Sequence, residues 1–173
     1  AAHGGNRQRL LGRLTLAAIA LLAFQIFLGG LTSANFAALA CRTLPDCHGS
    51  WLPGKGLATA FDLSREHQIT DRGMAVGGDE RAAIHKTHRL GAVLTLLIAL
   101  SAGLIALSAG RAFRGVATIV LVLVMFEFSV GIASVLTGLP LALAVAHNWL
   151  AALLLLSLLK LMALNRQSGR VAG

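Results

Sequence analysis

Long apolar segments dominate the pattern of hydrophobic and polar positions along this 173-residue chain. Four of them are long enough to cross a bilayer, which requires about 20 residues per helix. They predict helices at about residues 10–34, 83–109, 113–136 and 141–164, with an outer loop at about 35–82. We therefore predict an all-α, polytopic membrane protein whose single domain, residues 1–173, is an antiparallel bundle of four transmembrane helices.

The apolar segments contain an internal repeat. FQIFLGG (Phe24–Gly30) in the first predicted helix resembles FEFSVGI (Phe126–Ile132) in the third, and HRLGAVL (His88–Leu94) in the second resembles HNWLAAL (His147–Leu153) in the fourth. The repeat predicts two helical hairpins related by a pseudo-twofold axis. Membrane proteins built from such repeats often have a binding site where the repeats meet.

Composition and charge agree with a membrane location. Hydrophobic residues make up 56% of the chain and charged residues 13%, whereas soluble domains have about 25% charged residues. The net charge of +8 does not indicate nucleic-acid binding, because the chain has no Tyr and no basic stripe interleaved with aromatics. Eight of the fifteen basic residues lie at helix ends and tails with no acidic residue near them, and the other seven lie between Arg42 and Arg89 with six acidic residues. Anionic membrane lipid is the expected partner of these ends.

The basic residues also predict the orientation. The short loop between the second and third helices carries Arg111 and Arg114 without any acidic residue, and the amino-terminal segment before the first helix is likewise purely basic. Positively charged short segments favour the cytoplasmic side. We predict a multi-pass protein of a bacterial-type inner membrane, with cytoplasmic termini and the long loop outside.

Two histidines occupy equivalent positions of the repeat, near the outer ends of the second and fourth predicted helices. An ionisable group inside a membrane is costly and therefore suggests a functional site. His88 and His147 on facing helices are suited to bind a haem iron from both sides within a four-helix bundle. The alternative is that each imidazole only forms a hydrogen bond to a neighbouring helix, and the matched positions favour the first interpretation.

Other polar residues lie near these histidines. Arg89 suits either a haem propionate or a lipid phosphate. His85 shares a helix face with His88 and could be a proton donor, a transient ligand or a lining group, but a partly exposed interfacial histidine is slightly favoured. Gln25 and Glu127 occupy equivalent repeat positions and are both candidates to line the cofactor slot; for Glu127 a proton relay is possible and an interhelical hydrogen bond is favoured.

The outer loop contains the two cysteines of the chain, Cys41 and Cys47. In an oxidising compartment this pair predicts a disulfide. Their spacing excludes a CxxCH haem-attachment motif, and His48 adds one ligand where a zinc site requires four. Two roles remain open: a staple for the loop, or a redox pair that exchanges with a thiol partner.

Taken together, these residues resemble the haem A synthase family over nearly the whole chain. The motifs that carry the resemblance are QxxLGG from Gln25, ALACxxxPxCxGxWxP from Ala38, HxxHR from His85, and GLPL from Gly138 ahead of His147. Members of this family usually have eight helices in two homologous halves. The resemblance implies oxidation of a haem O methyl group to the formyl group of haem A for cytochrome oxidase assembly, with haem O in one half and haem b in the other.

One departure from the family pattern identifies the half. The substrate half carries ExxHR, whereas His85 stands at the glutamate position here. The chain therefore resembles the carboxy-terminal, haem-b half, which implies His88 and His147 as axial ligands and a second four-helix half as partner, either an amino-terminal half or another copy. His85 and Glu127 remain catalytic candidates. The alternatives are a non-enzymatic b-type cytochrome and a haem-free assembly subunit.

Overall fold

The computed structural model describes residues 2–54, 56–62 and 78–171 and confirms the predicted all-α fold. All four long helices are long and apolar enough to span a membrane. The helices are α1 (Ala2–Ala34), the short α2 (Leu57–Ala60), α3 (Asp79–Leu107), α4 (Arg111–Leu136) and α5 (Leu141–Val171).

Three of the long helices extend several residues further than the apolar pattern predicts. α1 begins at residue 2 instead of about 10, α3 at residue 79 instead of about 83, and α5 ends at residue 171 instead of about 164. Hydropathy detects only the part of a helix that suits lipid, whereas backbone hydrogen bonding continues into the polar zone. At the start of α3, Asp79 and Glu80 occupy the first turn, where acidic side chains favour a helix amino terminus.

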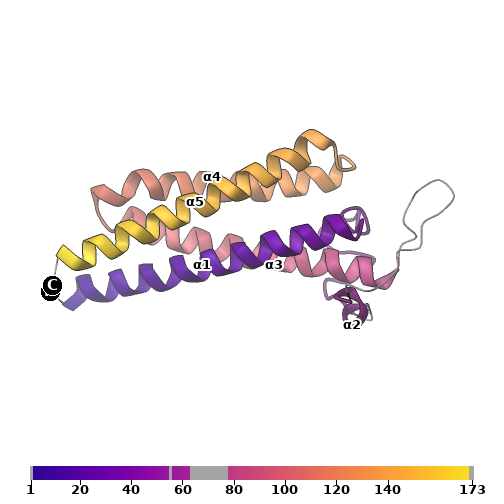
Figure 1. Cartoon of the computed structure of the whole chain (residues 1–173), viewed down its shortest axis with the longest axis horizontal. Coiled ribbons are helices and arrows are strands. Elements are labelled where there is room, and N and C mark those ends of the chain that lie inside the picture. Colours follow the sequence, from indigo (N-terminus) through magenta and orange to yellow (C-terminus); the bar gives the residue numbers. More distant parts are fainter. Residues whose placement is uncertain (1, 55, 63–77, 172–173) are drawn as a thin grey trace.

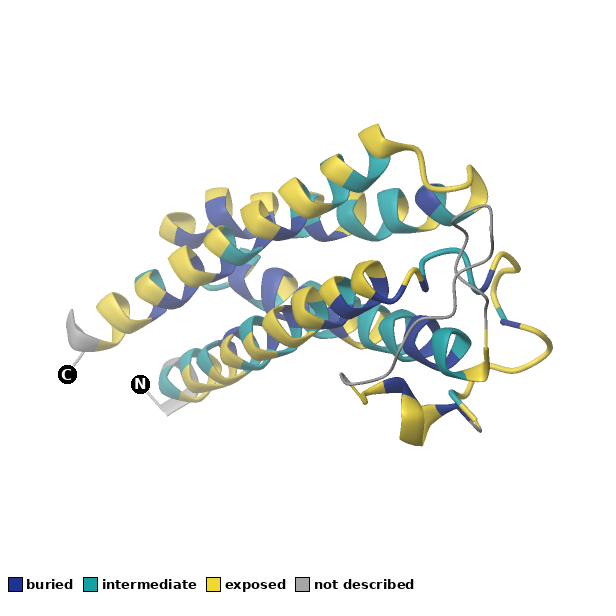
Figure 2. Cartoon of the chain, turned by 45° about the vertical axis from the view of Figure 1, so that its right-hand side comes forward, coloured by how far each residue is buried: buried dark blue, intermediate teal, exposed yellow. Residues whose placement is uncertain are grey.

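The helices form two antiparallel hairpins, α1 with α3 and α4 with α5 (Figure 1). α3 also packs on α4, and α1 on α5, so each long helix contacts two others and the four close into a bundle. Exposed residues run along the outward faces of the bundle (Figure 2), and many of them are large and apolar. Because lipid is as apolar as the interior, such faces are expected of a membrane bundle.

Small and branched side chains fill the middle of the bundle. All four long helices contribute to one buried cluster, which comprises Ala18, Leu22, Ala99, Val120, Val124, Leu154 and Leu158. Ala102 and Ala106 are also fully buried on α3, and small residues of this kind let neighbouring helices approach closely. The core fixes the two hairpins against each other and so determines how their histidines face one another.

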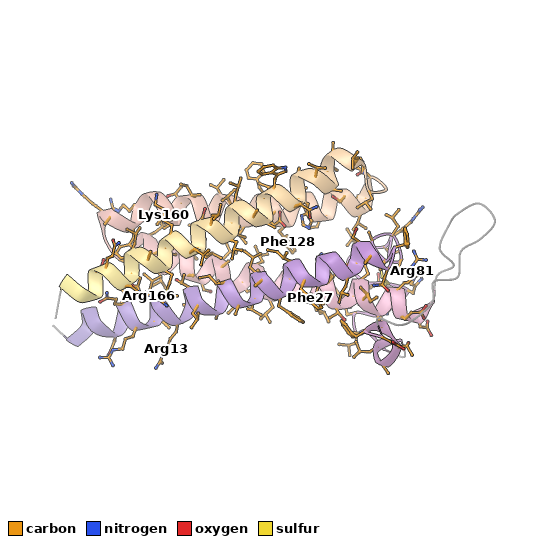
Figure 3. The ribbon with its side chains drawn as sticks, viewed as in Figure 1. Arg13, Phe27, Arg81, Phe128, Lys160 and Arg166 are labelled. Carbon is orange, nitrogen blue, oxygen red and sulfur yellow. A yellow bond between two sulfur atoms is a disulfide. The ribbon has the colours of Figure 1, made fainter. Side chains whose placement is uncertain are left out.

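Polar contacts join α1 to α5 at the end of the bundle away from the long loop. Gln8 Nε2 donates to the Asn165 carbonyl oxygen at 2.9 Å, and Asn165 Nδ2 donates to the Gln8 carbonyl oxygen at 3.3 Å. Gly12 leaves room for this contact, because a Cβ there would lie 2.9 Å from Asn165 Nδ2. Arg13, Lys160 and Arg166 lie toward the same end, whereas Arg81 lies near the loop (Figure 3).

Asn165→Ala should therefore loosen the α1–α5 contact. We expect the free energy of unfolding to fall by about 1 kcal/mol, within the range measured for hydrogen bonds between membrane helices. Reversible unfolding in mixed detergent micelles, followed by circular dichroism, measures the change. Gln167→Ala, at an exposed position two residues further along α5, is the matched control, and an equal loss in both variants would contradict the role assigned to Asn165.

Candidate functional site

His88 on α3 and His147 on α5 face each other across the two hairpins. Their ring centroids are 6.5 Å apart, and the planes of the rings are nearly perpendicular, at 82°. Both residues are half-buried, so the pair lies inside the bundle yet close to its surface. The structure thus brings together the two histidines that the repeat places at equivalent positions.

Each imidazole contacts the polar side chain that the repeat places on the neighbouring helix of its own hairpin. Gln25 Nε2 donates to His88 Nδ1 at 2.9 Å and to the His88 carbonyl oxygen at 2.8 Å. Glu127 Oε1 lies 3.1 Å from His147 Nδ1, a close contact that is not aligned as a hydrogen bond. The two hairpins therefore build the same arrangement twice, with an amide in one and a carboxyl group in the other.

A glycine one turn after each of these polar residues makes room for the imidazole. A Cβ on Gly29 would lie 3.5 Å from His88 Cε1, and a Cβ on Gly131 would lie 3.1 Å from His147 Cε1. The second distance is too short for an ordinary contact, so a side chain at position 131 would push the ring away. Sequence reasoning did not assign this role, although the two glycines are aligned in the repeat.

The exchange of an amide for a carboxyl group makes the two histidines chemically different. A carboxylate only accepts hydrogen bonds, so Glu127 favours a proton on Nδ1 of His147 and leaves Nε2 free to bind a metal. Gln25 donates to Nδ1 of His88, which places the proton of that neutral ring on Nε2. Gln25 Oε1 is buried without a hydrogen-bond partner in the described structure. Rotation of the Gln25 amide by half a turn would direct Oε1 to Nδ1 of His88. The proton of the ring would then lie on Nδ1, and Nε2 would be free.

Arg89 binds the disulfide loop and does not join the histidine pair. Its Nη1 donates to the carbonyl oxygens of Thr43 at 2.8 Å and Asp46 at 3.1 Å, and its Nη2 donates to that of Cys41. Its Nε donates to His85 Nε2 at 3.3 Å. The guanidinium therefore anchors the loop to α3, a partner that the sequence analysis did not consider, and its predicted role toward a haem propionate stays a prediction.

His85 is buried, with 3% of its surface exposed. The expectation of a partly exposed interfacial histidine was therefore wrong, because the loop and α1 cover this turn of α3. Beyond the bond from Arg89, its Nδ1 has no hydrogen-bond partner in the described part of the chain. His85 thus supports the arginine that holds the loop.

The loop itself is closed by a disulfide between Cys41 and Cys47. Both cysteines are buried, and backbone hydrogen bonds in both directions between Cys47 and Ser50 fold the next turn against them. Within residues 2–54, 56–62 and 78–171, no three His, Cys, Asp or Glu side chains gather in a way that would hold a metal ion. Within these segments, the disulfide closes the loop and the guanidinium of Arg89 attaches it to α3.

The fold and the paired histidines define a four-helix membrane protein with a candidate cofactor site between two repeats. Comparison with known proteins identifies the family: the model of the cytochrome oxidase assembly protein family COX15-CtaA matches residues 2–159. The chain belongs to this family.

Curated relatives are named heme A synthase. The chain is 39% identical to that of Shewanella oneidensis over 154 residues, which are 86% of this chain and 44% of the relative. It is 32% identical to the heme A synthase of Rhizorhabdus wittichii, and the match covers 84% of this chain and 38% of the relative. It is 31% identical to the heme A synthase of Methylobacterium radiotolerans, and the match covers 76% of this chain and 34% of the relative. The chain thus spans less than half the length of these relatives.

Arg89→Lys should weaken the attachment of the loop. Lysine keeps the charge, but it lacks the planar fork that reaches several carbonyl oxygens at once. Because thiol–disulfide exchange depends on access to the sulfur atoms, we expect the Cys41–Cys47 disulfide to be reduced several-fold faster by dithiothreitol. Maleimide labelling against time measures the rate. Arg42→Lys, at an exposed position in the same loop, is the control; unchanged reduction of Arg89→Lys would contradict the anchoring role.

Proposed function

We propose that this chain binds haem b between His88 and His147 and acts as the haem-b-binding half of a haem A synthase. The observation that carries the proposal is the 6.5 Å separation of the imidazole centroids. A ring nitrogen binds a metal at about 2 Å, so two imidazoles that would hold one ion between them need ring centroids roughly 6 Å apart. A single ion between the rings therefore fits this spacing without a large movement of the helices.

The neighbouring residues support the same proposal. Glu127 and Gln25 contact Nδ1 of the two imidazoles, which is where side chains behind a ligating histidine act to fix its tautomer and orientation. Gly131 and Gly29 leave the space that lets each imidazole ring lie close to the neighbouring helix of its hairpin. When bound, the haem would supply a one-electron iron couple, while the bundle holds the ligands and keeps the site apolar.

Oxidation of the haem O methyl group requires more than this chain. His85 stands where the substrate half of the family has glutamate, and it is buried beneath Arg89 with one ring nitrogen occupied. The named relatives are also more than twice as long as the matched segment. We therefore infer that a second four-helix unit with an ExxHR motif carries the substrate, and that this chain passes electrons to it.

Replacing either ligand should abolish haem retention. The variants are expressed with haem supplementation, and reduced-minus-oxidised spectra are recorded. We expect the b-type absorbance of His88→Ala or His147→Ala to be about a tenth or less of that of the unsubstituted chain, because a single imidazole is left. His85→Ala should retain most of it, since this residue faces the loop. Circular dichroism confirms that each variant folds. Loss of haem only in His85→Ala, or no b-type absorbance in the unsubstituted chain, would refute the ligand assignment.

The alternative function is a free electron carrier, which the histidine at position 85 favours because the substrate half of the family has glutamate there. Co-expression distinguishes this carrier from one half of an enzyme. In a host without its own synthase, we expect haem A in extracts only when this chain and an ExxHR-bearing unit are present together. The matched control replaces the glutamate of that unit by alanine. Equal amounts of haem A with and without this chain would show that it is not needed for the oxidation.

A further inference from the structure

The two hairpins present different polar groups to the imidazoles of the histidine pair. Glu127 on α4 occupies the repeat position of Gln25 on α1. A carboxyl group therefore lies beside Nδ1 of His147, whereas an amide lies beside Nδ1 of His88. The rest of the arrangement matches, because in both hairpins a glycine four residues after the polar side chain leaves space for the ring. One carboxyl group in place of one amide is thus the main chemical difference between the two halves of this site.

The carboxyl group of Glu127 is held in poorly solvated surroundings. Its Oε1 lies 3.1 Å from Nδ1 of His147, and 15% of its side chain is exposed. Its Oε2 is buried and has no hydrogen-bond partner in the described part of the chain. Electrostatic interactions are stronger in such surroundings than in water, so the carboxyl group acts mainly on the imidazole of His147.

The two groups differ in how strongly they accept a proton from the imidazole. A histidine that binds a metal through Nε2 carries its proton on Nδ1, and the acceptor of that proton affects how basic the ligand is. A hydrogen bond to an ionised group is about twice as strong as a neutral one. Glu127 should therefore make His147 the more electron-donating ligand. Gln25 offers only an amide oxygen to His88, even after its amide has rotated.

A more electron-donating ligand changes the balance between oxidised and reduced iron. Ferric iron carries one more positive charge than ferrous iron, so it gains more from an electron-rich imidazole. Hydrogen bonds behind an axial ligand are among the ways in which a protein adjusts the reduction potential of a haem. A carboxylate behind one ligand consequently favours the ferric state, and an uncharged amide behind the other ligand does so much less.

We propose that Glu127 is a positioning residue that acts through His147 to lower the midpoint potential of the haem. This inference rests on the proposed function, in which His88 and His147 are the axial ligands. It adds the group that sets the driving force of electron transfer. A lower potential makes the haem a stronger reductant, which suits a chain that passes electrons to a second unit.

Potentiometry of the haem-loaded protein, followed by the b-type absorbance, tests the proposal. Glu127→Gln keeps the shape of the side chain and removes its charge. We expect the equilibrium between ferric and ferrous haem to shift about tenfold toward the ferrous form, the lower end of the effect of groups behind a metal ligand. Tenfold corresponds to a rise of about 59 mV for one electron. Asp79→Asn, which removes an exposed carboxylate at the start of α3, is the matched control. An unchanged potential in Glu127→Gln would overturn the proposal.

The repeat provides a second test in the opposite direction. Gln25→Glu places a carboxylate behind His88 and should lower the potential by a similar amount. The double variant with Gln25→Glu and Glu127→Gln exchanges the two groups between the hairpins, so its potential should return close to that of the unsubstituted chain. A purely structural role of Glu127 would not restore the potential in this way. If Gln25→Glu fails to fold, the shift in Glu127→Gln decides alone.

Nuclear magnetic resonance of the haem-free protein tests the difference between the two imidazoles without any potential. With nitrogen-labelled histidine, we expect Nδ1 to carry a proton in His147 and none in His88, because Glu127 accepts from the first ring and Gln25 donates to the second. The variants His88→Ala and His147→Ala assign the signals. The same protonation of Nδ1 in both rings would overturn the inferred difference.

The two kinds of failure can be told apart. Absence of b-type absorbance in the unsubstituted chain would overturn the proposed function and this inference together. Normal b-type absorbance with equal potentials in the unsubstituted chain and Glu127→Gln would overturn this inference alone and leave the ligand assignment intact.

Discussion

A bilayer core offers no hydrogen-bond partners, and the rest of this structure depends on that constraint. Most hydroxyl groups in the spans satisfy it locally, as Thr15 and Thr32 do by donating to the carbonyl oxygen four residues earlier. Gln25, Glu127 and Asn165 each contact another helix instead. The interhelical polar contacts therefore fix the register of neighbouring helices at two places in the bundle.

These two places lie at opposite ends of the bundle and act on different helix pairs. Near the long loop, each polar contact stays within one hairpin and orients an imidazole toward the other hairpin. At the far end, Gln8 and Asn165 join α1 directly to α5. The apolar core between these two places keeps the helices in the same relative positions along the bundle. The distance between the histidines therefore depends on packing along the whole bundle.

The sequence predicted the helices and the facing histidines because both follow from patterns that a bilayer imposes: apolar length, and polar residues repeated at matched positions. It could not predict the partners of Arg89 or the burial of His85. Both depend on the path of the loop after α1, where Phe36 and His48 adopt left-handed backbone conformations that no periodic pattern reveals. The helix ends were also placed too far inward, since hydropathy does not detect turns such as Asp79–Glu80 that lie in the polar zone.

An even number of spans has a consequence for how larger proteins can be assembled from this fold. α1 begins and α5 ends on the side of the bundle opposite the disulfide loop (Figure 1). Two such units joined in tandem would need only a connector along one membrane face, and both would keep the same orientation in the bilayer. Duplication of a four-helix unit therefore preserves its topology, whereas duplication of a unit with three or five spans would invert every second copy.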